Sequence, residues 1–281
     1  MLERFSKSYR IVNKEKFVEK LINFSVDQDY FILLNSNNNS DKYDLLCGYG
    51  VKSFIKSSEN SLKKLDNFFE LKKDWLFGYM TYDLRNEIEV LNDDNIDFIN
   101  MPNLYFFQPE IVWFVKGKIV TGLSFEKDLI DNDWKKFNEI SKKEKTKNSS
   151  IVKLNLRNSK SEYINKVNKI KERIFRGDCY EMNFCFDLFS EYDEINPYDT
   201  YVKLNNYTKS PMSSFLKVND LFLISSSPER FLSKNGEDII SQPIKGTAKR
   251  GDSPEEDKKN INELLSSPKE LSENHMIVDL V

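Results

Sequence analysis

SSSPERFLSKNGEDIISQPIKGTAKRG, residues 225–251, reads as two short strands joined by a tight turn. The turn is marked by Asn235-Gly236, which lies between two apolar segments. An Asn-Gly pair in this setting is the strongest short-range signal for a β-hairpin, because both central residues of a type I′ turn need a positive φ. Such a turn would pair Phe231 with Ile240. The stretch therefore predicts antiparallel strands in this part of the fold.

Two side chains of opposite charge flank this hairpin. Glu229 begins the first strand and would fall opposite Gln242, and Lys245 follows three residues later in a Pro-Ile-Lys-Gly-Thr turn. Three extended residues span roughly 10 Å, which two long side chains can bridge around a small ring. An acid and an amine aimed at one spot favour acid–base or nucleophilic chemistry. The simpler alternative, favoured by residue types alone, is an edge hairpin with a surface ion pair.

The composition favours a mixed fold with a large core. The 281 residues are 39% hydrophobic and include 21 Phe and 13 Tyr, which are enriched in strands. The net charge is −3, and the 42 Lys and Arg residues are scattered among 45 acidic ones, so no nucleic-acid-binding patch is indicated. No signal peptide and no long apolar span is present, so no membrane association is expected.

Cysteine and histidine usage narrows the chemistry. The three cysteines, Cys47, Cys179 and Cys185, form no Cys-x-x-Cys pair, which suits a reducing compartment. His275 is the one histidine in the sequence, which disfavours a histidine-based zinc site or a Ser-His-Asp triad. The sequence therefore predicts a cytoplasmic protein without such sites.

Two regions are expected, residues 1–150 and residues 151–281. The boundary is placed at residues 141–150 (SKKEKTKNSS), the most polar and linker-like stretch. The first region reads as the first half of an α/β fold built around antiparallel strands, with Gly78 allowing a close backbone approach or a bulge. Its expected helices cover residues 14–24 and 57–71, and its expected strands cover 30–34, 75–89, 104–115 and 118–123.

The second region begins with a strongly specified helix. Ser159 and Glu162 form a capping box, and Gly177 ends the helix as a left-handed C-cap would. Residues 179–189 then alternate, with apolar side chains on one face and polar ones, including Glu181, on the other. A strand with one wet face is the simpler interpretation. The alternative is that the polar face lines a substrate cavity.

Two further helix starts follow the hairpin. Residues 253–256 and 267–270 each place a capping serine, a proline at the first helical position and a glutamate at the third. The second helix carries Glu270 and Glu273 as neighbours on one face. Oxygen ligands suit Mg²⁺, which takes one or two protein carboxylates with waters and the substrate's anion. The alternative is a capping acid at Glu270 and a solvated surface residue at Glu273.

Five blocks of this sequence resemble the chorismate-utilising enzymes, a family that includes anthranilate synthase component I, aminodeoxychorismate synthase component I, and the isochorismate and salicylate synthases. The blocks occur in the family's order. They are GYMTYDL (78–84), GDCYEMNFC (177–185), SSSPERFL (225–232), PIKGTAKRG (243–251) and ELSENHMIVDL (270–280). The resemblance implies an α+β fold, in which large antiparallel β-sheets pack together with flanking helices around a buried site for chorismate and Mg²⁺.

The resemblance also implies roles for individual residues. Glu229 matches the acid that helps the chorismate C4 hydroxyl to depart. Gly246 and Thr247 match a turn whose backbone amides meet the substrate carboxylate, a role open to unhindered N–H groups. Glu273 matches a Mg²⁺ ligand, and Glu270 would contribute beside it, directly or through water.

Lys245 indicates the branch of the family. Anthranilate synthases, the alternative, usually carry alanine at this position, whereas the lysine form resembles aminodeoxychorismate synthase, in which the lysine attacks chorismate at C2. An amine with few carboxylates to hold its proton can serve as that nucleophile. The expected reaction is amination of chorismate by ammonia to 4-amino-4-deoxychorismate, for p-aminobenzoate and folate synthesis. A glutamine amidotransferase subunit would supply the ammonia.

Glu181 departs from the family pattern. The ammonia-using members usually carry Gln there, and the water-using synthases carry Lys. The absence of Lys argues against water as the nucleophile, and we expect Glu181 to contact the substrate in a polar, base-like role toward ammonia.

Length is the second departure, because the family continues well past the block at 270–280. The apolar run at 276–281 has no helix-stop signal, so we expect the chain to be cut within a structural element. The Mg²⁺ site would then be incomplete and the 281 residues inactive alone. A third interpretation is a non-catalytic fragment that only binds, for example to the amidotransferase.

Overall fold

The computed structural model describes residues 3–40, 42–89, 91, 96–140, 152–191 and 195–281. They belong to two compact units: Met1–Thr146 with Asn196–Pro228, and Lys147–Ile195 with Glu229–Val281. The chain therefore returns to the first unit after its first passage through the second. The predicted linker at 141–150 lies outside the described residues, and the boundary placed there stays a prediction.

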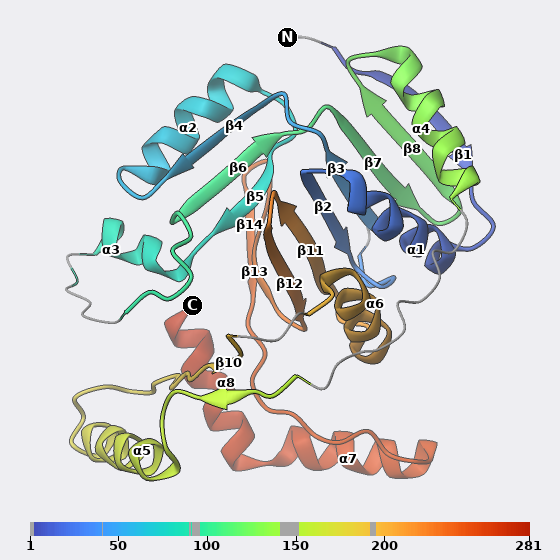
Figure 1. Ribbon diagram of the computed structural model, residues 1–281. Helices are drawn as coiled ribbons and strands as arrows, with labels where there is room; N and C mark the ends of the chain where they lie inside the picture. The colour runs from blue at the N-terminus through green and yellow to red at the C-terminus, as the bar shows by residue number, and fades with distance from the viewer. Residues whose placement is uncertain (1–2, 41, 90, 92–95, 141–151, 192–194) are drawn as a thin grey trace. The chain divides into compact units, whose positions relative to one another are not determined.

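A seven-stranded antiparallel sheet forms the centre of the first unit (Figure 1). In spatial order its strands are β1 (Phe5–Arg10), β8 (Ile119–Ser124), β7 (Ile111–Lys116), β3 (Leu45–Tyr49), β2 (Tyr30–Asn35), β11 (Met212–Val218) and β12 (Leu221–Ser227). Gly117, with a φ of +60°, allows the tight turn between β7 and β8. Asn35 lies opposite Ser213, so the sheet joins strands that are far apart in the sequence.

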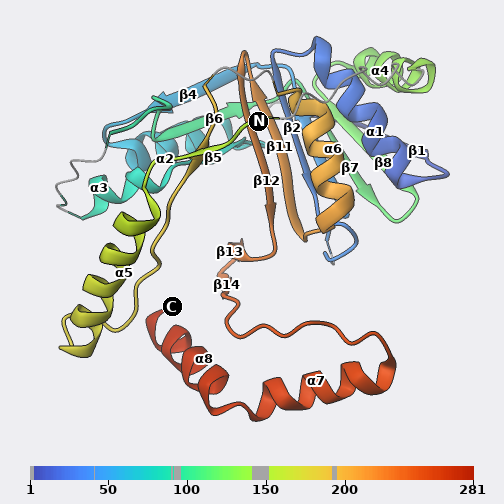
Figure 2. The ribbon, with the colours of Figure 1, turned by 60° about the horizontal axis from the view of Figure 1, so that its bottom comes forward.

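Three helices cover one face of this sheet: α1 (Lys14–Phe24), α4 (Lys127–Glu139) and α6 (Pro197–Thr208) (Figure 2). The bounds of α1 are those predicted from its apolar periodicity. Trp113 and Phe215 project from the sheet into this layer and are fully buried. Phe137 of α4 packs edge-on against Trp113, with 5.3 Å between ring centroids. Burial of such large aromatic side chains is the main stabilising contribution of this layer.

A three-stranded antiparallel sheet packs against the other face. Its strands, in spatial order, are β4 (Ser53–Ser57), β6 (Leu104–Gln108) and β5 (Phe77–Met80). Phe31 and Leu33 of β2 face the helices, whereas Ile32 faces this second sheet, as the two-residue period of a strand requires. A Cβ at Gly78 would lie 1.9 Å from the Tyr105 carbonyl oxygen of β6. The close backbone approach predicted at Gly78 is therefore confirmed.

Four further helices of the described residues complete the first unit. They are η1 (Ser25–Asp27), α2 (Ser61–Lys72), which packs over β4 and β6, η2 (Tyr82–Leu84) and α3 (Arg85–Ile88). The helix predicted at 57–71 is present but begins later, because Ser57 still belongs to β4. The strand predicted at 75–89 is too long, since the chain leaves β5 after Met80 and turns into η2 and α3.

The second unit is built from helices and short strand pairs. They are α5 (Lys160–Phe175), α7 (Pro254–Ser266) and α8 (Pro268–Leu280), β9 (Asn155–Leu156) paired with β10 (Leu188–Phe189), and β13 (Arg230–Asn235) paired with β14 (Asp238–Gln242). The three predicted helix starts are confirmed. Ser159, Ser253 and Ser267 each accept a hydrogen bond from the backbone N–H three residues later. Gly177 follows α5 with a φ of +80°, as the predicted C-cap requires.

The strand predicted at 179–189 is wrong over most of its length. Only its last two residues, Leu188–Phe189, pair with another strand, and residues 179–187 form neither helix nor strand. Alternation of polar and apolar side chains makes a strand possible, but a strand also needs a partner backbone to receive its hydrogen bonds.

The hairpin predicted from 225–251 is present, but its register is wrong. Asn235 pairs with Asp238, so the turn is centred on Gly236-Glu237, and Ile240 lies opposite Ser233 rather than Phe231. Gly236 has a φ of +63°, whereas neither Asn235 nor Glu237 has a positive φ. This pattern fits a type II′ turn, which takes glycine at its first central position. A register irregularity then leaves Arg230, not Glu229, opposite Gln242.

The predicted fold class is confirmed. A large antiparallel sheet packs against a second sheet and is flanked by helices on its other face. None of the helices in the described part of the chain is long and apolar enough to cross a membrane. Cys47, Cys179 and Cys185 are free thiols, in line with the absence of a Cys-x-x-Cys pair.

Candidate active site

The seven residues predicted for the site all lie in the second unit. They are Glu181, Glu229, Lys245, Gly246, Thr247, Glu270 and Glu273. Four segments carry them: the chain after α5, the residue before β13, the turn after β14, and the first two turns of α8.

The turn after β14 is held from both sides. The Glu229 carboxylate accepts a hydrogen bond from the backbone N–H of Ile244, with 3.2 Å between Oε1 and N. Gly246 has a φ of +77°, a conformation that other residues rarely adopt. A Cβ on Gly246 would lie 2.9 Å from Oε2 of Glu270, so the turn passes close to this side chain of α8. Thr247, the next residue, is exposed.

Lys245 lies between Ile244 and Gly246 and forms an ion pair with Glu181. The distance from Nζ to Oε1 is 3.7 Å, and the side chains are 29% and 25% exposed. One carboxylate, that of Glu181, thus lies near this amine, which was expected to have few carboxylates around it. Glu181 reaches the lysine from the irregular segment at 179–187, not from the polar face of a strand.

Glu270 and Glu273 share a cation at the start of α8. Lys269 Nζ lies 3.4 Å from Oε1 of Glu270 and 3.5 Å from Oε1 of Glu273. The hydrogen bond with Glu270, and then the charges of both carboxylates, raise the pKa of Lys269. Ser267 also caps the backbone N–H of Glu270. Ser267 thus caps the helix, but the Glu270 side chain does not complete a capping box and lies beside Lys269 instead.

This pair of carboxylates could supply protein ligands to Mg²⁺. Two oxygen donors on one helix face that already share a positive charge match the one or two carboxylates that Mg²⁺ takes from a protein. Within the described residues, no group of three or more His, Cys, Asp or Glu side chains forms a ready metal site. The remaining ligands would have to be waters and substrate oxygens.

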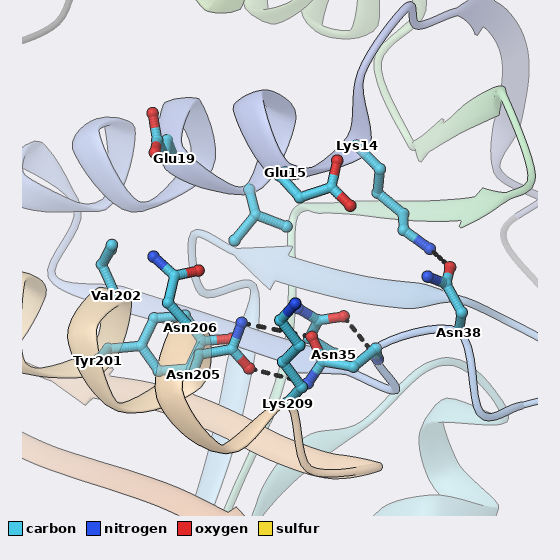
Figure 3. Close-up of a pocket in the computed structure, with 12 residues that line it drawn as sticks. Lys14, Glu15, Glu19, Asn35, Asn38, Tyr201, Val202, Asn205, Asn206 and Lys209 are labelled. Carbon is cyan, nitrogen blue, oxygen red and sulfur yellow. Dashed lines mark hydrogen bonds between the residues drawn. The ribbon is translucent and has the colours of Figure 1, made fainter. Parts of the chain in front are cut away.

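A separate pocket of about 150 Å³ lies in the first unit, between α1, α6 and the loop after β2 (Figure 3). Asn37 donates from Nδ2 to Oδ1 of Asn205 at 2.9 Å and to the Ser210 carbonyl at 2.7 Å. None of the predicted site residues lines it. The signal that the sequence offers here is a run of asparagines, of which Asn37 and Asn38 adopt a positive φ.

The comparison with protein families identifies the chain. The family described as chorismate binding enzyme matches residues 26–281. The chain belongs to this family. The resemblance inferred from the five sequence blocks is thereby confirmed at the level of the family.

Two kinds of relative are similar to this chorismate binding enzyme. Aminodeoxychorismate synthase component 1 of Salmonella typhimurium is 27% identical over 206 residues, covering 73% of this chain and 45% of the relative. Anthranilate synthase component 1 of Lactococcus lactis is 30% identical over 217 residues, covering 72% of this chain and 47% of the relative. The chain thus spans under half the length of either relative.

A solved structure supports the fold. The crystal structure of anthranilate synthase component I from Streptococcus pneumoniae matches with a TM-score of 0.69 and 21% sequence identity. The match covers 89% of this chain and 60% of the solved one. At this identity the similarity concerns the fold alone.

Proposed function

We propose that these residues are part of an aminodeoxychorismate synthase component 1, which aminates chorismate with ammonia to 4-amino-4-deoxychorismate. The observation that carries the proposal is the position of Lys245. Its backbone is held between the Glu229 contact at Ile244 and the glycine turn at Gly246, and its amine is partly shielded from water. A lysine fixed in this way is suited to nucleophilic attack.

In the proposed reaction, the Lys245 amine forms a bond to C2 of chorismate while the bond from C4 to its hydroxyl breaks. Glu229 gives a proton to the departing hydroxyl, which leaves as water. Ammonia then bonds to C4, and the bond between Lys245 and C2 breaks as the double bonds shift back. Gly246 and Thr247 would meet the substrate carboxylate through backbone N–H groups.

Glu270 and Glu273 would hold Mg²⁺, which when bound supplies positive charge for the substrate's carboxylate. Lys269 has to leave the two carboxylates for this to occur, because its ammonium group lies between them. A glutamine amidotransferase subunit is the proposed source of ammonia. The product would serve p-aminobenzoate and folate synthesis, and the proposed location of the protein is the cytoplasm.

The test is turnover by the protein expressed from its complete natural reading frame, with chorismate, ammonium and Mg²⁺. Mass spectrometry separates 4-amino-4-deoxychorismate from anthranilate, which also fluoresces. We expect the aminated product and its loss in Lys245→Ala. Anthranilate as the wild-type product would refute the proposal and favour the alternative, an anthranilate synthase component 1.

The 281-residue chain is assayed beside it, and we expect no product from it alone. Measurable turnover by these residues would contradict that expectation. Calorimetric titration with chorismate and Mg²⁺ tests the third interpretation, a non-catalytic fragment that only binds a partner such as the amidotransferase. Such a fragment should bind chorismate weakly or not at all.

A further inference from the structure

We propose that Glu181 is the proton partner of Lys245: it holds the amine as an ammonium ion in the substrate-free protein and accepts its proton when the amine attacks. The inference rests on the proposed function, in which Lys245 is the nucleophile. It assigns Glu181 to the lysine, whereas the sequence assigned it to ammonia.

The ion pair between Glu181 and Lys245 differs from the local pairs of the second unit. Lys259 and Glu263 also lie 3.7 Å apart, but they are one helical turn apart in α7 and their side chains are 73% and 64% exposed. Glu181 and Lys245 come from two separate segments, and each side chain is less than one third exposed. Partial shielding from water strengthens the attraction between opposite charges.

Local structure fixes both partners. On the lysine side, the Ile244 N–H bond to Glu229 and the left-handed Gly246 hold the backbone. On the glutamate side, the chain leaves α5 through a C-terminal cap, in which Gly177 N–H bonds to the Ile174 carbonyl at 3.0 Å. Backbone contacts therefore lie next to Lys245 and four residues before Glu181.

The other acids of the site are committed elsewhere. The Glu229 carboxylate accepts from Ile244, and the Glu270 carboxylate lies against Lys269 and the glycine turn. Among the described residues, Glu181 is the one carboxylate within 4.0 Å of the Lys245 amine. The protonated form of a lysine amine has no free electron pair and cannot attack, so a proton acceptor beside it is needed.

Attack on chorismate requires this ammonium ion to lose a proton, and Glu181 is placed to take it. One Nζ–H bond of Lys245 breaks and one O–H bond forms on Glu181. The electron pair left on Nζ then forms the bond to C2. The present separation of 3.7 Å exceeds a hydrogen bond, and contacts of this kind commonly shorten when the substrate binds.

The test measures acetylation of Lys245 by a water-soluble acetyl ester, which reacts only with neutral amines. Peptide mass spectrometry gives a rate for each lysine in the 281-residue chain, with Lys234 of the hairpin as the internal reference. For Glu181→Gln we expect Lys245 to react roughly two- to fivefold faster, the range that a partly exposed ion pair supports. In the matched control, Glu237→Gln in the exposed hairpin turn, the rate should not change.

Salt provides a second measurement that does not depend on a variant. Raising NaCl to 1 M should accelerate acetylation of wild-type Lys245 and leave the Glu181→Gln rate unchanged, because salt screens the charge only where the carboxylate is present. An unchanged or slower Lys245 rate in Glu181→Gln, or equal salt responses in the two proteins, overturns the ion pair.

Turnover by the protein from its complete reading frame tests the proton transfer. Glu181→Gln should lower kcat by roughly 100-fold or more, the usual contribution of a general base, while it raises the acetylation rate. If Glu181 only supported the local structure, its loss would not lower kcat and raise the acetylation rate at the same time. Unchanged turnover in Glu181→Gln overturns the proton transfer. Absence of aminated product from the wild type overturns the proposed function, but the acetylation result would still show the ion pair.

Discussion

Tyr49 is the centre of a buried polar network in the first unit. Its hydroxyl donates to Oδ2 of Asp133 at 2.7 Å and accepts from Nε1 of Trp113 at 3.0 Å. All three side chains are almost completely buried, and Asp133 is 2% exposed. Burial, followed by the charge and hydrogen bond of Asp133, raises the pKa of Tyr49, so the hydroxyl stays protonated and able to donate.

Tyr49→Phe removes this hydroxyl without changing the ring that packs against Phe24. Asp133 keeps Lys136 at 2.8 Å but loses its buried donor, and the Trp113 N–H loses its acceptor. A hydrogen bond to a charged group contributes about 1.5–3 kcal/mol, and a buried donor left without a partner costs about 1–3 kcal/mol. Because the two losses share one hydroxyl, we expect a total of about 2–4 kcal/mol.

Urea denaturation followed by tryptophan fluorescence is the assay. Trp75, Trp113 and Trp134 all lie in the first unit, so the signal reports its unfolding. With a slope near 2 kcal/mol per M, the midpoint should fall by about 1–2 M. The matched control is Tyr9→Phe, which removes a hydroxyl that donates to Asp131 of the same helix, a side chain that is 36% exposed. Equal losses in the two variants would refute the argument from burial.

Three further predictions concern other parts of the molecule. Gly78→Ala should lower the melting temperature strongly in circular dichroism, because its Cβ would collide with the β6 backbone; an unchanged melting temperature would show that β5 can shift. Burial acts to raise the pKa of Asp74, but hydrogen bonds, foremost from Arg4, outweigh it and lower the pKa below the ordinary 3.8. The contacts of Asp74 therefore stabilise the fold above about pH 3.8, and this contribution is lost as the pH falls further. The free energies of unfolding of wild type and Asp74→Asn should thus become equal in acid, and a difference that stays constant with pH would contradict this. Glu273→Gln should weaken Mg²⁺ binding severalfold in calorimetric titration, and Glu263→Gln on α7 should not; equal affinities in both variants exclude Glu273 as a ligand.

Local signals in the sequence were sufficient for most helices. The capping serines at 159, 253 and 267 specify where three helices begin, because the cap bonds join residues three apart and need no distant partner. The turn at Gly117 also depends only on neighbouring residues, so its position could be predicted in the same way. The pairing of β2 with β11 could not be predicted, because two strands so far apart leave no pattern that relates their registers.

The errors in the second unit have one physical origin, the absence of a covering partner. Alternation at 179–187 predicted a strand, yet no neighbouring backbone among the described residues receives its hydrogen bonds. In the hairpin, the turn moved by one residue because glycine at the first central position alone satisfies a type II′ turn. No buried face opposes such a shift, since β14 is exposed along its whole length.

The sequence could indicate candidate site residues but not the contacts between them. Lys245, Glu229, Glu270 and Glu273 are candidates because each belongs to a block that resembles the family, and their roles stay predictions. The sequence could not predict that Glu270 lies against Gly246, or that Glu181 faces Lys245, since these contacts join separate segments. A resemblance can indicate which residues matter, but only three-dimensional geometry indicates which of them act on each other.

The two units are stabilised in different ways, and this difference bears on the site. Both apolar cores lie in the first unit, whereas Ile277 is the one buried apolar side chain among the described residues of the second. The second unit is held instead by helix caps, the glycine turn and ion pairs, of which Arg250 with Asp257 has two hydrogen bonds. Such contacts are individually weak and sensitive to salt, so local opening is expected to be easy there. The groups proposed for chemistry therefore belong to the unit whose contacts are more easily opened and more sensitive to salt.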